Sequence, residues 1–459
     1  MKTIVSLGAL CIGTAIFAGC AGNSGSVPAS PVAVGAQAPG AAAASNTRSV
    51  ATGNAAYGHS HKVCGDAPAG SARCHSLVRD DLAPTHLASD AKPDRRPAPS
   101  PAPSPTSSPV TTPTPGATAT PPSGTPPPCT HNSGINGFQP CELQKAYNLT
   151  SFSTANGASS TVAIVDAYDD PNAEADLANY RSTFGLPACT TANGCFRKVN
   201  QTGGTTYPTA NASWGQEISL DLDMVSAICP NCKILLVEGT TSSNANLAAA
   251  VDEAAALGAT SISNSYGSAE NTAYDSHYNN HPGITVTASS GDSGYGTQSP
   301  ASAVNVVAVG GTALTAGGTR PGGYSETAWT SAGSGCSTSN AKPAWQTFTA
   351  CGTFRGEADV SAVADPNTGV AVYDSFGGGK TATGWLVFGG TSVASPIIGA
   401  VYGLAHTGES NASKLYSNAN ALFDVTSGSN GSCGAPVCTA GAGWDGPTGL
   451  GSPNGIAAF

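Results

Sequence analysis

Residues 161–187 read TVAIVDAYDDPNAEADLANYRSTFGLP, and this stretch predicts a buried strand that leads directly into a helix. The run Thr161–Ala167 is apolar throughout instead of alternating, as expected for a strand covered on both faces. The helix is expected over residues 171–184, because Gly185 and Pro187 follow as a stop signal. A strand followed by a helix is the repeating unit of parallel α/β sheets.

The same alternation continues along the chain. Further apolar runs predict strands at residues 233–238, 260–265, 284–289, 305–310 and 370–373. Helices are expected at residues 216–228, 246–257 and from 391 to about 406. The predicted fold class is therefore α/β, doubly wound, with a mostly parallel sheet flanked by helices. In such sheets, functional sites lie beyond the carboxyl ends of the strands.

Composition narrows the class of partner. Of the 459 residues only 10% are charged, and 18 basic residues face 28 acidic ones, giving a net charge of −10. Nucleic-acid binding needs basic patches, so we expect no nucleic-acid partner. No internal apolar run approaches the ~20 residues that span a bilayer, which argues against a polytopic membrane protein.

The amino-terminal third is expected to be an export and tethering region. Residues 1–19 have a basic start and an apolar centre, as in a signal peptide. Phe17-Ala18-Gly19-Cys20 resembles a bacterial lipobox, which predicts a lipid on Cys20 and an extracellular or cell-envelope location. An ordinary secreted protein and an uncleaved anchor are the alternatives.

The chain between this leader and the main domain is expected to contain three parts. Residues 20–56 form a flexible tether, residues 57–96 a small segment that contains Cys64 and Cys74, and residues 97–128 a Pro-rich linker. The globular domain is then expected over residues 129–459.

Cysteine usage also indicates export. The chain has 14 Cys; Cys11 lies in the leader, Cys20 is assigned to lipid, and the remaining twelve form sequence-adjacent couples. The expected disulfides are 64–74, 129–141, 189–195, 229–232, 336–351 and 433–438. The couple Cys229-Pro-Asn-Cys232 could instead be redox-active or half a zinc site, although no second such pair appears.

A nucleophile candidate lies in GTSVASP at residues 390–396. Ser392 is at the start of a predicted helix after a glycine turn, where backbone N–H groups and the helix dipole favour a developing oxyanion. The alternative is that Thr391 and Ser392 only cap the helix. None of the eight His residues has the context of a subtilisin base.

A pair of carboxylates offers a different base. Glu217 and Asp221 in WGQEISLDLDMVSAICP are four residues apart and share one helix face. The neighbouring apolar residues indicate that the helix is buried, so the pair would share a proton or a partner. A solvated acidic face is the alternative, and Asp223 is given no role. Asp166, at the end of the first strand, is interpreted as structural or supporting.

The segment SSGDSG contains Asp292 and Ser293. A trypsin-like interpretation with Ser293 as nucleophile lacks the His segment and the antiparallel barrel that it needs. Asp292 alone could be a turn residue that follows a strand.

Taken together, these motifs resemble the sedolisin family of serine-carboxyl peptidases over about residues 133–459, in the order expected for that family. The resemblance implies a subtilisin-like fold with Ser392 as nucleophile, Glu217 as base, Asp221 orienting the base, and Asp292 in the oxyanion hole. It also implies a Ca²⁺ site at Asp424, Val425, Gly441, Gly443 and Asp445. The implied function is cleavage of protein or peptide substrates at acidic pH by a monomer.

One feature departs from the resemblance. Sedolisins usually carry a large folded propeptide, and here that space holds the tether, the small disulfide segment and the Pro-rich linker. Two alternatives therefore stay open. One is a catalytically inactive, sedolisin-like binding module on the cell surface, and the other is a subtilisin-type hydrolase with an unrecognised His.

Overall fold

The computed structural model describes residues 59–82, 129–377 and 383–459. The predicted signal peptide, the lipid site at Cys20, the tether of residues 20–56 and the linker of residues 97–128 lie outside these ranges. Within the described ranges, no helix combines the length and the apolar character that crossing a membrane requires.

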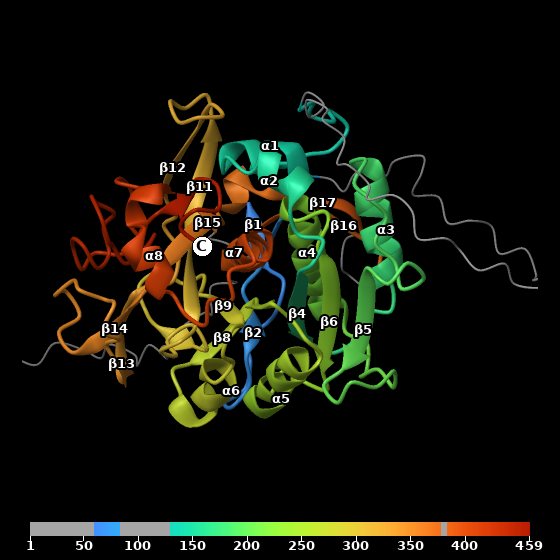
Figure 1. Cartoon of the computed structure of the whole chain (residues 1–459), viewed down its shortest axis with the longest axis horizontal. Coiled ribbons are helices and arrows are strands. Elements are labelled where there is room, and N and C mark those ends of the chain that lie inside the picture. The colour runs from blue at the N-terminus through green and yellow to red at the C-terminus, as the bar shows by residue number, and fades with distance from the viewer. Residues whose placement is uncertain (1–58, 83–128, 378–382) are drawn as a thin grey trace, which may run out of the picture. The chain divides into compact units, whose positions relative to one another are not determined.

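A large sheet forms the centre of the domain (Figure 1). Its strands, in spatial order, are β12 (Tyr324–Ala328), β11 (Val307–Ala316), β9 (Thr285–Ser289), β7 (Ser261–Asn264), β4 (Thr161–Ala167), β6 (Lys233–Gly239) and β5 (Phe196–Asn200), with β15 (Val360–Val363) also paired to β11. Every neighbouring pair is parallel except β11 with β12. The predicted mostly parallel α/β sheet is confirmed.

Helices flank this sheet. They are α1 (Pro140–Ala146), α2 (Thr150–Ala155), α3 (Ala173–Thr183), α4 (Ala212–Ile228), α5 (Asn244–Ala256), α6 (Asp275–Asn279), α7 (Thr391–Ala405) and α8 (Ser413–Ser417). Helices α4 and α7 pack against each other and on the sheet, while α5 packs on β4 and β6. Helix α4 begins earlier than expected, because the Asn211 side chain caps it by accepting from the Trp214 N–H.

The predicted strand at residues 370–373 is present but belongs to a different sheet. It is β16 (Val370–Asp374), which pairs antiparallel with β17 (Gly384–Gly389). A continuous apolar run indicates burial on both faces and carries no information about the direction of its partner. The expectation that this run joins the parallel sheet is therefore wrong.

The amino-terminal segment of residues 59–82 is built into the domain. Its strands β1 (Ser60–Lys62) and β3 (Leu77–Arg79) extend the β16–β17 sheet, in the order β1-β3-β17-β16. Its strand β2 (Arg73–Cys74) pairs antiparallel with β8 (Tyr266–Ala269), which also pairs with β10 (Gln298–Ser299) (Figure 1). Two short ladders, β13 (Gly335–Ala341) with β14 (Phe354–Glu357) and β18 (Leu422–Phe423) with β19 (Ser452–Pro453), complete the strands.

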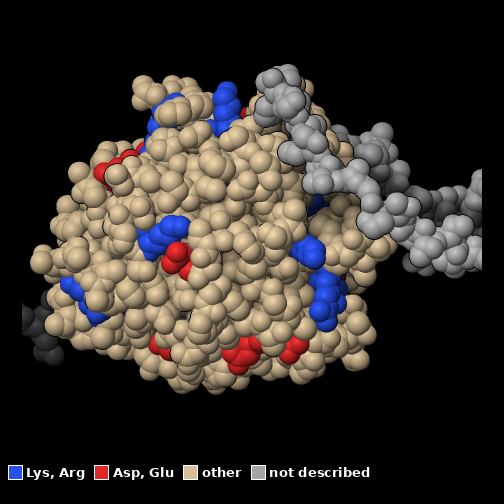
Figure 2. Space-filling view, viewed as in Figure 1, with Lys and Arg blue, Asp and Glu red and all other residues tan. Residues whose placement is uncertain are grey.

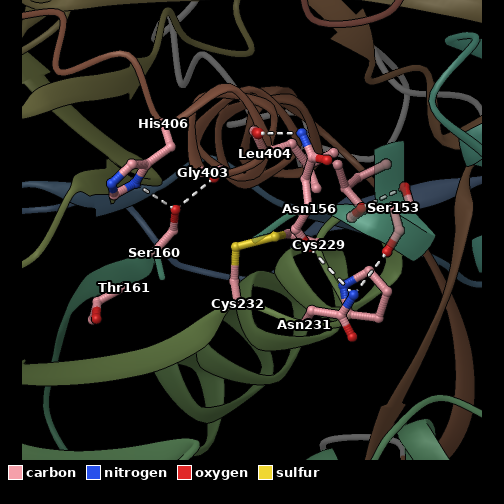
Figure 3. The surroundings of a disulfide bond; sticks show 12 residues. Ser153, Asn156, Ser160, Thr161, Cys229, Asn231, Cys232, Gly403, Leu404 and His406 are labelled. Atoms are coloured by element: carbon pink, nitrogen blue, oxygen red, sulfur yellow. Dashed lines mark hydrogen bonds between the residues drawn. A yellow bond between two sulfur atoms is a disulfide. The ribbon is translucent and has the colours of Figure 1, made fainter. Parts of the chain in front are cut away.

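All six expected disulfides are present in the described residues. The Cys229–Cys232 bridge lies at the end of α4, close to the ends of α2 and α7 (Figure 3). Around it, Asn156 donates to the Leu404 carbonyl at 3.0 Å and the Ser160 hydroxyl donates to the Gly403 carbonyl at 2.6 Å. Both sulfurs are buried, so this couple is a structural bridge and not an exposed redox pair.

Candidate active site

Ser392 lies in the first turn of α7, directly after the carboxyl end of β17, and is fully buried. Gly390, with a φ of 97°, makes the turn between the two elements. The Ser392 hydroxyl donates to the Ser265 carbonyl at 3.1 Å. Its backbone N–H donates to the His75 carbonyl at 3.0 Å. The nucleophile candidate therefore has an N–H group directed at a carbonyl oxygen.

Glu217 and Asp221 lie on α4, which packs against α7, and both are fully buried. None of their four carboxylate oxygens forms a hydrogen bond of standard geometry with the described residues. Burial raises the pKa of Glu217, while the nearby hydroxyls of Ser392 and Ser76 lower it. Because these hydroxyls favour the ionised form, Glu217 is placed to exchange a proton with Ser392.

Asp166, which the sequence analysis did not place in the site, joins this pair. It is the last but one residue of β4 and is fully buried, and both of its carboxylate oxygens lack a hydrogen-bond partner among the described residues. Burial and the charge of Glu217 raise the pKa of Asp166, and burial and the charge of Asp166 raise that of Asp221. Three carboxyl groups thus form one buried cluster, in which burial first, and then mutual repulsion, favours the protonated forms.

Asp292 lies in the loop after β9, beside the start of α7. One carboxylate oxygen accepts from the Thr391 N–H at 2.8 Å and from the Thr391 hydroxyl at 2.9 Å. Burial raises the pKa of Asp292 to about 7, against the opposing effect of these two donors. Below neutral pH the group is therefore protonated and can donate a hydrogen bond. Its Oδ2 atom lies near Gly390, as does the His75 carbonyl.

His75 is a second residue at this site that the sequence analysis missed. It follows β2 in the amino-terminal segment and is 1% exposed. Its imidazole does not contact the Ser392 hydroxyl: Nδ1 pairs with Ser289 at 2.8 Å and Nε2 with Gln298 at 3.1 Å. The part of His75 that contacts Ser392 is therefore its backbone carbonyl oxygen. The local sequence around His75 does not predict this contact.

The residues of the predicted calcium loop lie together near the carboxyl end. The Gly443 N–H donates to Asp424 and the Gly441 N–H donates to Asp445, both at 3.0 Å. Burial, with a smaller contribution from the charge of Asp424, raises the pKa of Asp445 to about 7. A cation would relieve this repulsion, and the available donors are all oxygens, so the set fits a hard cation.

A second carboxylate group could also hold a metal ion. Asp170, Asp176 and Asp374 are buried, and one oxygen from each lies within 4.8 Å of the others. Burial raises the pKa of Asp170 to about 8 and that of Asp374 to about 7. Sequence analysis did not single out this group, because its members come from the turn after β4, from α3 and from β16.

Two peptidases are similar to this chain in sequence. Kumamolisin from Bacillus sp. (strain MN-32) is 29% identical over 372 residues, which are 71% of this chain and 64% of kumamolisin. Sedolisin from Pseudomonas sp. (strain 101) is 30% identical over 370 residues, 69% of this chain and 60% of sedolisin. The chain is a relative of these two peptidases. The match spans less than two thirds of either relative, and no family model matches the chain.

Solved structures agree with this relationship to sedolisin and kumamolisin. A structure of Pseudomonas sedolisin, a serine-carboxyl proteinase complexed with two molecules of pseudo-iodotyrostatin, superposes with a TM-score of 0.59 at 27% identity. The match covers 70% of this chain and 96% of that one. The fold is accordingly the subtilisin-like one that the motifs implied.

Proposed function

We propose that the protein is a serine-carboxyl peptidase that hydrolyses peptide bonds of protein substrates at acidic pH. The observation that carries the proposal is that Ser392 is buried beside the Glu217 carboxyl, while its N–H donates at 3.0 Å to the His75 carbonyl, near which buried Asp292 also lies. The relationship to sedolisin and kumamolisin supports the same activity.

Each residue then has a part in acyl transfer. The Ser392 hydroxyl attacks the substrate carbonyl and passes its proton to Glu217, which later protonates the leaving amine. Within the carboxyl cluster the negative charge belongs on Glu217, because the Ser392 and Ser76 hydroxyls stabilise it there. Asp221 stays protonated and orients Glu217. Protonated Asp292 and the Ser392 N–H stabilise the tetrahedral oxyanion.

We place a Ca²⁺ ion at the carboxyl-terminal loop. Asp424 and Asp445 would supply carboxylate oxygens, and Val425, Gly441 and Gly443 backbone carbonyls, which is a donor set that calcium prefers. Its part is to hold the loop against repulsion between the two carboxylates. The six disulfides support export of the protein. We further propose a lipid on Cys20, a cell-envelope location and a monomeric state.

The test is a series of casein digestions by the full-length chain from about pH 3 to about pH 8, beside the Ser392→Ala variant. Cleavage that peaks in acid and disappears in the variant supports the peptidase. A folded chain that cleaves nothing at any pH would refute it and favour the binding module. Replacing all eight His residues without loss of cleavage would exclude a subtilisin-type base.

A further inference from the structure

The His75 side chain lies in a closely fitted pocket beside the candidate nucleophile. Its Nδ1 atom pairs with the Ser289 hydroxyl at 2.8 Å, and its Nε2 atom pairs with the Gln298 side-chain oxygen at 3.1 Å. A Cβ built on Gly267 would lie 2.5 Å from the His75 Cε1 atom and 2.7 Å from Gln298 Oε1. A side chain in place of Gly267 would therefore intrude on the space that the ring fills.

The pocket is formed by the peptidase domain and not by the segment that fills it. Gly267 lies on β8, Ser289 ends β9 and Gln298 begins β10. His75 follows β2, which pairs antiparallel with β8. Addition of an extended peptide to a strand edge is a common mode of peptide binding. The same three residues can therefore receive a side chain of another peptide that pairs with β8 in this way.

The backbone beside the pocket determines which residue of a substrate enters it. The His75 carbonyl accepts from the Ser392 N–H at 3.0 Å. A Cβ built on Gly390 would lie 2.1 Å from this oxygen and 2.8 Å from Asp292 Oδ2. In the proposed reaction, the attacked carbonyl lies at the Ser392 N–H and Asp292. The side chain that enters the pocket is therefore that of the residue on the acyl side of the cleaved bond.

The hydrogen bonds of the pocket suit an uncharged imidazole. The Gln298 oxygen can only accept, so the ring carries its hydrogen on Nε2, and Nδ1 is then the acceptor for the Ser289 hydroxyl. Burial first, with smaller contributions from the charges of Arg73 and Lys62, lowers the pKa of His75 to about 3, although the bonds to Gln298 and Ser289 act in the opposite direction. The pocket imposes this burial, so burial acts in the same way on the ring of a substrate.

The acidic groups near the pocket have other partners. Asp292 accepts from the Thr391 N–H at 2.8 Å. Glu270, which directly follows β8, accepts from the Thr338 N–H at 2.9 Å. The two side-chain partners of the His75 ring in the described part of the chain are both uncharged.

We propose that Ser289 and Gln298 determine specificity, and that the peptidase prefers substrates with an uncharged histidine on the acyl side of the cleaved bond. This preference rests on the proposed function. A leucine at the same place would leave both polar groups buried without partners, which lowers affinity. A protonated histidine, a lysine or an arginine would bring a positive charge into a pocket whose lining residues are uncharged.

The test compares two peptides that differ only in having His or Leu at this place. Both are added together to the full-length chain, and mass spectrometry measures each product and identifies the cleaved bond. Competition in one reaction gives the ratio of the two kcat/KM values, whatever fraction of the active sites residues 59–82 occupy. At pH 6 the ratio should favour the His peptide by about 10-fold or more.

The ratio should also increase with pH. The ordinary pKa of a histidine side chain is about 6.5, so the uncharged fraction of the His peptide rises about 10-fold for each pH unit between about pH 4 and pH 6. The ratio of kcat/KM values should rise by the same factor, because both peptides share any effect of pH on the catalytic groups.

A pair of variants isolates the pocket. Gln298→Leu removes the acceptor for Nε2, so the ratio should fall to about 1 at every pH. Gln201→Leu is the matched control, because Gln201 follows β5 and its side-chain oxygen accepts from the Thr240 N–H instead. It should keep the wild-type ratio. The pH series on the wild type decides the proposal even where Gln298→Leu fails to fold.

The outcomes separate the two proposals. Equal kcat/KM values for the two peptides at every pH, with casein cleaved, would overturn the specificity and leave the peptidase standing. A preference for His that is largest at pH 4 would overturn selection of the uncharged ring. Cleavage of neither casein nor the peptides would overturn both proposals, whereas a preference that grows with pH and needs Gln298 supports both.

Discussion

Asp292 is the residue whose protonation state limits the proposed chemistry. Burial raises its pKa to about 7, so the carboxyl donates a hydrogen bond below that pH and loses its proton above it. Its other oxygen is already held by two donors from Thr391. Ionisation would place a negative charge beside the developing oxyanion, which would destabilise the transition state.

Asp292→Asn tests this role directly. An Asn side chain keeps the acceptor for Thr391 and offers an N–H donor at every pH, so the fall in activity near pH 7 should weaken or disappear. The measurement is kcat/KM of the variant against pH, with wild type beside it. If kcat/KM of the variant falls toward pH 7 as steeply as that of wild type, the result would contradict the role of protonated Asp292.

Glu217→Gln tests the base. The substitution keeps the size of the side chain but removes the proton acceptor, so kcat should fall by about 10³-fold or more while the fold is unchanged. Glu253→Gln on α5, a partly exposed carboxylate, is the control and should keep wild-type turnover. Near-normal turnover in Glu217→Gln would remove Glu217 from the mechanism.

At the scale of elements, two buried helices hold the site. Helices α4 and α7 carry Glu217 and Ser392, respectively, and pack against each other along their lengths. The Cys229–Cys232 bridge follows the last turn of α4, next to the carbonyls that end α7 (Figure 3). A bridge that closes so short a loop adds little chain-entropy stabilisation, so we expect its contribution to come from packing.

The Cys229→Ser, Cys232→Ser double variant should therefore melt several degrees lower, because it places two hydroxyls where buried sulfurs were packed. Turnover at low temperature should stay normal, since the bridge follows the last turn of α4, whereas Glu217 lies in the first half of that helix. The control is the same change at Cys433 and Cys438, where Cys433 is exposed. Equal losses in melting temperature at both pairs would show that packing is not the cause.

At the scale of the whole molecule, buried carboxyl groups set the dependence of stability on pH. Burial raises the pKa of Asp292, Asp374 and Asp445 to about 7 and those of Asp170 and Glu238 to about 8. Charged side chains are meanwhile sparse on the face shown in Figure 2, so acid adds little repulsion there. Between about pH 4 and pH 7 the folded chain binds more protons than the unfolded chain, and its stability must fall as pH rises.

The melting temperature of Ser392→Ala should accordingly be higher at pH 4 than at pH 7, by about 5 °C or more, in a buffer that contains a chelator. The variant prevents self-digestion from distorting the measurement. A melting temperature that rises with pH over this range would show that the carboxyl groups are ionised in the folded state.

Calcium should add to the stability at neutral pH. Its binding would relieve the repulsion between Asp424 and Asp445, so added Ca²⁺ should raise the melting temperature of the chelated Ser392→Ala chain. Introducing Asp445→Asn should abolish this rise, whereas Asp374→Asn, in the other carboxylate group, should preserve it. A rise that survives Asp445→Asn but not Asp374→Asn would move the ion to the group of Asp170, Asp176 and Asp374.

Local relationships in this protein were readable from the sequence. The disulfides join cysteines that are 3 to 15 residues apart, so adjacency identified their pairing. Glu217 and Asp221 share a face because a helix repeats every 3.6 residues. The apolar runs predicted the parallel strands β4, β6, β7, β9 and β11, but not β5 or β15. The motif GTSVASP likewise indicated Ser392 as the candidate nucleophile, and Ser392 lies in the first turn of α7 as expected.

Relationships between distant segments were decided only by the tertiary structure. Asp166 joins Glu217 and Asp221 because β4 ends beside α4, and β16 pairs with β17 instead of the parallel sheet. His75 reaches Ser392 because β2 and β3 pair with β8 and β17 on either side of it. Residue periodicity reports which face of an element is buried. It does not indicate which distant backbone pairs with a strand edge, and that pairing places the His75 carbonyl beside the candidate nucleophile Ser392.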